Sequence, residues 1–110
     1  MFWDDSDKAA VSIPITDFFG IGLGAICTFE NDLFSSPEGK SHNCFIPMSY
    51  RKGARIEIVN ESDKIIHFSY KINFLKVKKH NDDVLYFHSY WNREIKTELG
   101  KDFEILPRVE

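Results

Sequence analysis

The sequence lacks an excess of basic residues and any long hydrophobic run. Its 110 residues contain 14 Lys and Arg against 17 Asp and Glu, a formal net charge of −3. Proteins that bind nucleic acid or an anionic membrane surface usually present a basic patch. No stretch approaches the roughly 20 apolar residues of a membrane-spanning helix, and Asp4, Asp5 and Asp7 lie where a signal peptide would be basic. We therefore expect neither nucleic acid nor a membrane as a partner, and the sequence does not indicate a localisation.

Cysteines and metal ligands are also scarce. Cys27 and Cys44 are too far apart for a zinc or redox pair, so buried thiols are the simplest interpretation, and a disulfide stays open. The histidines are His42, His67, His80 and His88. They show neither the paired spacing of a zinc site nor a neighbouring cysteine. We expect no metal and no other cofactor.

Hydrophobic residues make up 43% of the chain, and ten of them are Phe, which indicates one folded domain over residues 1–110. Their period is two, the period of β-strands. Residues 66–74 alternate from Ile66 to Phe74 with polar residues between, and residues 55–59 alternate in the same way. The turn-forming residues 60–63 separate the two runs, so this part of the sequence predicts a hairpin.

Other segments extend the strand pattern. Residues 84–91 have no polar face, which is typical of a strand between two layers or under a partner. Residues 11–16 predict a short strand, and Pro14 confines it to a sheet edge or a bulge. Residues 17–24 hold three glycines without a nucleotide-binding spacing and predict a tight loop, whereas residues 76–83 predict a charged, solvated loop. With about eight short strands and no helix longer than a turn or two, the sequence predicts an all-β single jelly-roll β-sandwich.

Two carboxylates lie beside aromatic residues. Asp17 precedes the glycine loop, and Glu94 follows Trp91. A glycosidase needs two carboxyl groups about 5–10 Å apart, with aromatic faces against which the sugar packs, and Trp91 and Tyr90 could supply these faces. The alternative is purely structural: Arg93 and Glu94 form a local ion pair, Asp17 caps a turn and Trp91 fills the core. Both interpretations stay open at this point.

Several uncommon strings follow one another along the chain. They are Phe2-Trp3-Asp4-Asp5, Ile13-Pro14-Ile15-Thr16-Asp17-Phe18-Phe19-Gly20, Asn43-Cys44-Phe45-Ile46-Pro47-Met48, Arg51-Lys52-Gly53-Ala54-Arg55-Ile56, Asn60-Glu61-Ser62, and Tyr86-Phe87-His88 through Trp91, Arg93 and Glu94. In this order the chain resembles, over nearly all its length, the family known as domain of unknown function 2961, which includes glycoside hydrolase family 172. The resemblance implies two jelly rolls in one longer chain, oligomeric assembly, and retaining cleavage or rearrangement of fructose- or arabinose-containing glycosides.

The resemblance also bears on the site. The catalytic glutamates of that family lie in later Gly-Glu-Gly-Asp and Thr-Glu-Asp-Tyr motifs, which these 110 residues do not contain. We therefore expect no catalytic residue here, and a chain that is a fragment or stand-alone jelly-roll module, with the second jelly roll missing. The residues that match family motif positions, and that we expect to bind a carbohydrate ligand, are Asn43, His88, Trp91, Arg93 and Glu94.

Two further functions remain as alternatives. One is a non-catalytic carbohydrate-binding module, and the other is a structural, homo-oligomeric assembly module. Under any of the three interpretations we expect a homo-oligomer or a partner chain that supplies the second jelly roll.

Overall fold

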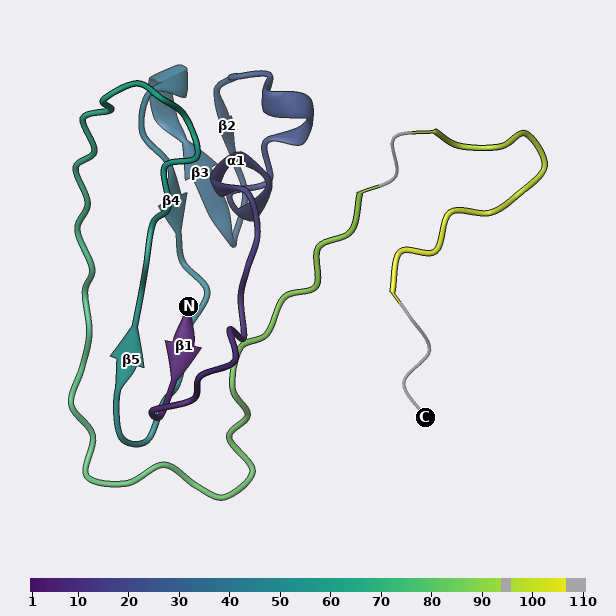
Figure 1. The fold of residues 1–110 in the computed structure, drawn as a ribbon. Coiled ribbons are helices and arrows are strands. Elements are labelled where there is room, and N and C mark those ends of the chain that lie inside the picture. Colours follow the sequence, from purple (N-terminus) through teal and green to yellow (C-terminus); the bar gives the residue numbers. More distant parts are fainter. Residues whose placement is uncertain (94–95, 107–110) are drawn as a thin grey trace.

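The strands of this protein are short and pair in two separate antiparallel sheets (Figure 1). The computed structural model describes residues 1–93 and 96–106. The strands are β1 (Phe2–Trp3), β2 (Phe29–Glu30), β3 (Phe34–Ser36), β4 (Asn43–Cys44) and β5 (Ala54–Arg55). The helical turns are α1 (Ile15–Phe18), η1 (Gly22–Gly24) and η2 (Pro37–Gly39). Strands and extended segments thus dominate the described chain, which confirms the all-β class, and the jelly-roll arrangement stays a prediction.

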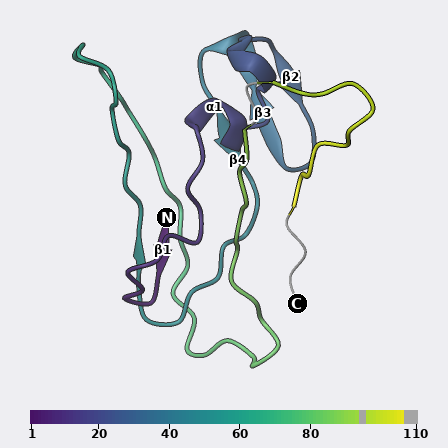
Figure 2. The same cartoon turned by 45° about the vertical axis from the view of Figure 1, so that its right-hand side comes forward.

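The first sheet pairs β1 with β5, and the second has the order β2-β3-β4. In the second sheet Glu30 lies opposite Ser35, which in turn lies opposite Asn43. Because neighbouring residues of a strand point to opposite faces, these three polar residues share one face, and Phe34 points to the other. Figures 1 and 2 both place α1 beside this sheet and the β1–β5 pair at the other end of the molecule.

Helix α1 replaces the strand expected over residues 11–16, and that prediction is wrong. Pro14 has a φ of −55° and is the N-cap of α1, and its carbonyl accepts a hydrogen bond from the Phe18 N–H at 3.0 Å. A proline suits a helix start because it has no N–H to leave unpaired there, and for the same reason it weakens a ladder. The rings of Phe18 and Phe19 then pack edge-on against Phe34, at centroid distances of 6.1 and 6.5 Å.

The hairpin expected over residues 55–74 forms only at its turn. Asn60 Oδ1 accepts hydrogen bonds from the Ser62 N–H and hydroxyl, and Asn60 Nδ2 donates to the Lys64 carbonyl at 2.8 Å. Beyond the turn, no ladder joins the two arms within the described residues, and Arg55 pairs with Phe2 of β1 instead. Alternation therefore located the turn, but it did not identify the strand partner.

Residues 84–91 run along the molecule without entering either sheet, so the predicted strand is not formed there. The chain as a whole is open: its radius of gyration is 16.6 Å, whereas a compact chain of this length has about 13 Å. Among the described residues, the buried hydrophobic side chains are Trp3, Ala10, Val11 and Ile21. No helix in the described part of the chain is long and apolar enough to cross a membrane.

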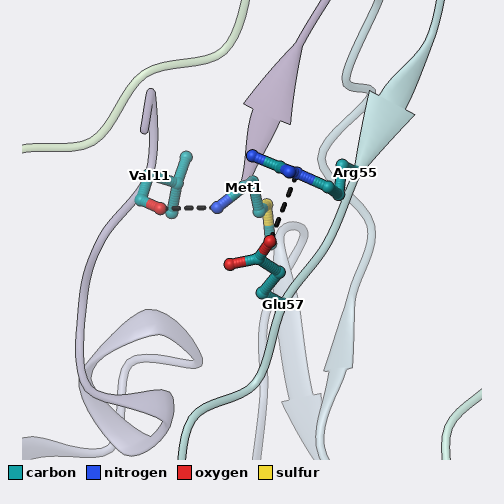
Figure 3. Close-up of polar contacts among 4 residues, drawn as sticks. All are labelled: Met1, Val11, Arg55 and Glu57. Carbon is teal, nitrogen blue, oxygen red and sulfur yellow. Dashed lines mark hydrogen bonds and ion pairs between the residues drawn. The ribbon is translucent and has the colours of Figure 1, made fainter. Parts of the chain in front are cut away.

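Figure 3 shows two polar contacts near the N-terminus, one within the N-terminal segment and one within the segment that begins with β5. The Met1 amino group donates to the Val11 carbonyl at 2.6 Å, and the Arg55 guanidinium forms an ion pair with Glu57 at 3.2 Å. Desolvation lowers the pKa of the amino group, and the negative charge of Glu57 acts in the opposite direction. The Arg55 guanidinium also lies 4.3 Å from the centre of the Phe2 ring, a cation–π contact that supports the β1–β5 pair.

Both cysteines are free thiols. Cys27 is exposed, so the interpretation as a buried thiol is wrong for this residue, and Cys44 is partly exposed on β4. Cys27 lies in the irregular segment between η1 and β2, where residues 25–28 are all exposed. The loop over residues 17–24 forms the tight turns that were expected, with positive φ at Gly20, Leu23 and Gly24.

The turn after β3 depends on Gly39, which has a φ of +63° and would place a Cβ 2.9 Å from Ile26 Cγ2. We expect Gly39→Ala to lower the free energy of unfolding by about 1–2 kcal/mol, because an L-residue is strained in left-handed backbone. Gly20→Ala isolates the backbone strain, since Gly20 has a φ of +76° and no atom within 4 Å of the added methyl group.

Gly22→Ala is the control, because that residue has neither a positive φ nor a close neighbour. Urea unfolding should place the three variants in the order Gly22→Ala, Gly20→Ala, Gly39→Ala from least to most destabilised. A Gly39 variant as stable as the Gly22 variant would contradict this account of the turn.

Candidate functional site

The indole of Trp91 is held at the surface by a carboxylate. Its Nε1 donates to Asp17 Oδ2 at 2.7 Å, and 39% of the residue remains exposed. Asp17 lies on α1, whose neighbouring residues Phe18 and Phe19 pack on Phe34, so the helix supplies a firm support for the carboxylate. Trp91 therefore does not fill the core, and the Asp17 side chain binds an indole rather than capping a turn. The structure brings together two of the residues that the sequence placed beside a sugar.

We call residues 84–91 the strap, because they cross the molecule on individual hydrogen bonds rather than in a ladder. Arg51 Nη2 donates to the Val84 carbonyl at 2.9 Å, and Trp3 Nε1 donates to the Phe87 carbonyl at 2.7 Å. The Ser89 N–H donates to the Ala10 carbonyl at 3.0 Å. The Tyr86 hydroxyl also donates to Asp4, and Trp91 to Asp17. Together these bonds attach the strap to the N-terminal segment, to α1 and to Arg51.

Asp4 joins three distant segments through one carboxylate, an arrangement we call the Asp4 clamp. Its Oδ1 accepts from the backbone N–H groups of Arg51, Lys52 and Gly53 at 3.0, 2.5 and 3.1 Å. Its Oδ2 accepts from the Tyr86 hydroxyl. The Asp4 N–H donates to the Gly53 carbonyl at 2.8 Å. The clamp thus connects β1, the loop before β5 and the strap.

The electrostatics of the clamp make Asp4 poorly suited to acid–base catalysis near neutral pH. Burial acts to raise its pKa, but hydrogen bonds from the Tyr86 hydroxyl and from the N–H groups of Lys52, Gly53 and Arg51 outweigh burial and lower the pKa from 3.8 to about 2. Donors to a carboxylate favour its charged form. A group with so low a pKa is a poor general base near neutral pH, so Asp4 serves to hold structure.

Sequence reasoning missed the clamp, although its residues lie in three of the strings that carry the family resemblance. Asp4 and Asp5 have φ values of 51° and 62°, and Asp is one of the few residues that tolerate this region. The Arg51 guanidinium lies 4.9 Å from the centre of the Tyr86 ring and adds a cation–π contact. The available signal in the sequence was the pair of adjacent aspartates after Phe2 and Trp3. It could indicate a turn, but it did not indicate which distant residues Asp4 would bind.

Asn43 lies apart from Trp91. Its Nδ2 donates to Ser35 Oγ at 3.1 Å on the polar face of the second sheet, whereas α1, which bears Asp17, packs on Phe34 at the other face. A shallow hollow of about 390 Å³ lies on this sheet, lined by Thr28, Phe29, Glu30, Ser35 and Pro37. Asn43 is therefore placed to contact a ligand from a different side of the sheet than Trp91.

The remaining predicted site residues belong to the strap or follow it. His88 is exposed on the strap, two residues after Tyr86. Arg93 is also exposed, two residues after Trp91. Glu94 lies outside the described residues. The carboxyl pair with Asp17 and the ion pair with Arg93 therefore both stay predictions. The predicted role of all five residues in binding a carbohydrate stays a prediction.

Other chemistry finds little support in the described part of the chain. Ser36 Oγ and His42 Nδ1 lie 3.1 Å apart, but Ser36 is completely buried, so its hydroxyl is not accessible to a substrate. The His42 ring packs against Phe19 at 5.5 Å, which gives the pair a structural explanation. No group of three or more His, Cys, Asp or Glu within residues 1–93 and 96–106 is placed to hold a metal ion.

The Asp4 clamp should make stability depend on acid pH. Because the pKa of Asp4 is lower in the folded protein than the ordinary 3.8, its contribution to stability is complete above that value and is lost as the pH falls from 3.8 to about 2. We expect Asp4→Asn to flatten the dependence of the free energy of unfolding on pH in this window. Denaturant unfolding at a series of pH values checks this.

Asp7→Asn is the matched control, because Asp7 is an exposed carboxylate of the same segment. It should keep the slope of the wild type. A slope that Asp4→Asn leaves unchanged would show that the clamp does not hold its carboxylate in the charged form.

One of three comparisons with known proteins found a match. A family model described as GH172 domain-like matches residues 1–72, which include Asp4, Asp17, Asn43 and the loop over residues 51–53, but not the strap. Searches of curated proteins and of solved structures found no match. With a match over more than half of its length, the chain belongs to the GH172 domain-like family.

Proposed function

We propose that this chain is a glycan-binding jelly-roll module of the kind found in glycoside hydrolases that act on fructose- or arabinose-containing glycans, and that it does not cleave them alone. Membership of the GH172 domain-like family supports a glycoside hydrolase-related module. The observation that carries the binding role is Trp91, whose exposed indole is fixed to Asp17.

The chemistry of the Trp91 site suits a sugar. The C–H groups of a sugar ring pack on an aromatic face, and carboxylate oxygens accept hydrogen bonds from its hydroxyls. The Asp17 carboxylate uses Oδ2 to hold the indole, and its other oxygen lies beside an aromatic ring whose orientation is already set. A ring held in place before the ligand arrives loses less entropy on binding than a free one.

The other predicted residues complete the proposal. His88, Arg93 and Glu94 lie near Trp91 in sequence and are proposed as its polar partners. Asn43, on the polar face of the second sheet, is proposed to contact a longer glycan that extends past the first sugar. On this proposal a single furanoside does not need Asn43, whereas an oligosaccharide does.

The proposal includes a partner for the exposed apolar side chains. Along the second arm beyond the turn, Ile66, Phe68, Ile72 and Phe74 are 46–63% exposed. Exposed patches of this kind commonly mark interfaces. We therefore propose that another copy of this chain or a second jelly roll covers this arm and completes a sandwich.

The first test of the binding role is Trp91→Ala. We expect it to weaken binding of methyl arabinofuranoside or methyl fructofuranoside at least tenfold, because the stacking surface is lost, and tenfold corresponds to about 1.4 kcal/mol. NMR titration of each glycoside measures the Kd. Phe45→Ala is the matched control, because Phe45 is a 59% exposed aromatic residue that lies outside both the predicted site residues and the apolar arm.

Equal loss in the two variants would indicate unspecific stacking on exposed rings. No binding of either glycoside by the wild type would favour the alternative function, a structural assembly module, and light scattering on the same sample would then report its oligomeric mass.

The second test concerns catalysis. We expect no hydrolysis of aryl fructofuranosides or arabinofuranosides by the purified chain, because its 110 residues contain neither the Gly-Glu-Gly-Asp nor the Thr-Glu-Asp-Tyr motif. The assay follows release of the aryl group. Turnover that Asp17→Asn or Glu94→Gln abolishes would overturn this part of the proposal and identify the carboxylate pair.

A further inference from the structure

The strap is held mainly by polar contacts. Its Tyr86 makes two of them, a hydrogen bond to Asp4 and a cation–π contact with Arg51. Apart from a local bond to Asn81, the strap's hydrogen bonds reach a different residue each, at Trp3, Asp4, Ala10, Asp17 and Arg51. Its side chains are exposed or only partly buried. A segment without a ladder or a packed core has few contacts that resist displacement, so the loss of one anchor affects its neighbours.

The two carboxylate oxygens of Asp4 bind different parts of the chain. Oδ1 holds the loop over residues 51–53 through three backbone N–H groups, whereas Oδ2 accepts from the Tyr86 hydroxyl and, at 3.3 Å, from the Arg51 N–H. Hydrogen bonds to an ionised acceptor are stronger than neutral ones. The same charge that fixes the loop therefore also fixes the start of the strap.

Tyr86 and Trp91 are five residues apart, a distance of up to about 17 Å along an extended chain. The Trp3 and Ala10 contacts lie between them, at Phe87 and Ser89. Displacement of Tyr86 therefore pulls on the same run of chain that brings the indole of Trp91 to Asp17.

We infer that Asp4 is a positioning residue for the glycan site: through the Tyr86 hydroxyl it sets the placement of the strap, and with it the orientation of Trp91. The inference rests on the proposed function in what the site binds, but not in how Trp91 is placed. Asp4 touches no ligand in this arrangement and acts only through Tyr86.

Asp4→Asn and Tyr86→Phe test the inference. An asparagine can keep Oδ1 as the acceptor for the loop, but it has a neutral NH2 donor in place of Oδ2, so the charge-assisted bond that the Tyr86 hydroxyl donates is lost. A phenylalanine keeps the ring beneath Arg51 and loses only the hydroxyl. We expect each variant to weaken binding of methyl arabinofuranoside or methyl fructofuranoside about tenfold, the equivalent of one charge-assisted hydrogen bond. The double variant should lose no more than either single variant, because both remove the same bond.

A second readout does not need a sugar. With 5-fluorotryptophan incorporated, the protein has two 19F resonances, from Trp3 and Trp91, which Trp91→Phe assigns. We expect the Trp91 resonance to shift or broaden in both variants. Asn60→Ala is the matched control: it removes the three hydrogen bonds that the Asn60 side chain makes in the turn, none of which involves the strap, and should leave the Trp91 resonance and the Kd unchanged.

The outcomes separate the inference from the proposed function. If the wild type binds neither glycoside, the proposed function fails, and a changed Trp91 resonance in Tyr86→Phe still supports the positioning role. If the wild type binds and both variants bind equally well with an unchanged resonance, the inference is overturned. It is also overturned if Asn60→Ala has the same effect as the two variants, because binding would then follow general stability. Should Asp4→Asn fail to fold, Tyr86→Phe alone decides.

Discussion

The carboxylate of Asp4 is the interaction on which the rest of this structure depends. It is bound by the N–H groups of residues 51–53 and by the Tyr86 hydroxyl, so one charge connects the first strand, the loop before β5 and the strap. Several donors around one acceptor stabilise the ionised form, which explains its low pKa. Removing such a group costs more than one hydrogen bond, because every donor it held is left without its partner.

Polar attachments of this kind matter more here than in most small domains, because the described chain buries few apolar side chains. A domain of this size normally gains its stability from one continuous core. Among the described residues, the largest fully buried side chains are those of Ile21 and Ser36, and the regular apolar alternation of residues 66–74 remains exposed. The hydrogen bonds of the clamp and the strap specify where segments lie, whereas the exposed apolar side chains of residues 66–74 contribute little free energy of burial.

How much the sequence could predict depended on whether the signal was local. The all-β class, the turn at residues 60–63 and the tight loop over residues 17–24 follow from short-range patterns, and the structure confirms them. Strand partners did not follow, since Arg55 pairs with Phe2, more than fifty residues away, and alternation carries no information on that choice. Pro14 fitted both an edge strand and a helix start, and only its neighbours in space decided between them. The contact between Trp91 and Asp17 joins two residues that the sequence analysis placed in one hypothetical sugar site, but no local pattern required a direct hydrogen bond between them.

The same reasoning explains why the predicted site divides between two faces. Register places Asn43 beside Ser35 and Glu30, and one residue of shift along β3 leads to Phe34, on which α1 packs. Since side chains alternate across a strand, no adjustment of rotamers moves Asn43 to the α1 face. A ligand that contacts both Asn43 and Trp91 must therefore pass around an edge of the three-stranded sheet, which a chain of several sugars can do and a single furanose cannot. If both residues bind a glycan as proposed, the affinity increases with glycan length as a consequence of strand register, and this dependence separates the contribution of Asn43 from that of Trp91 without a change to either residue.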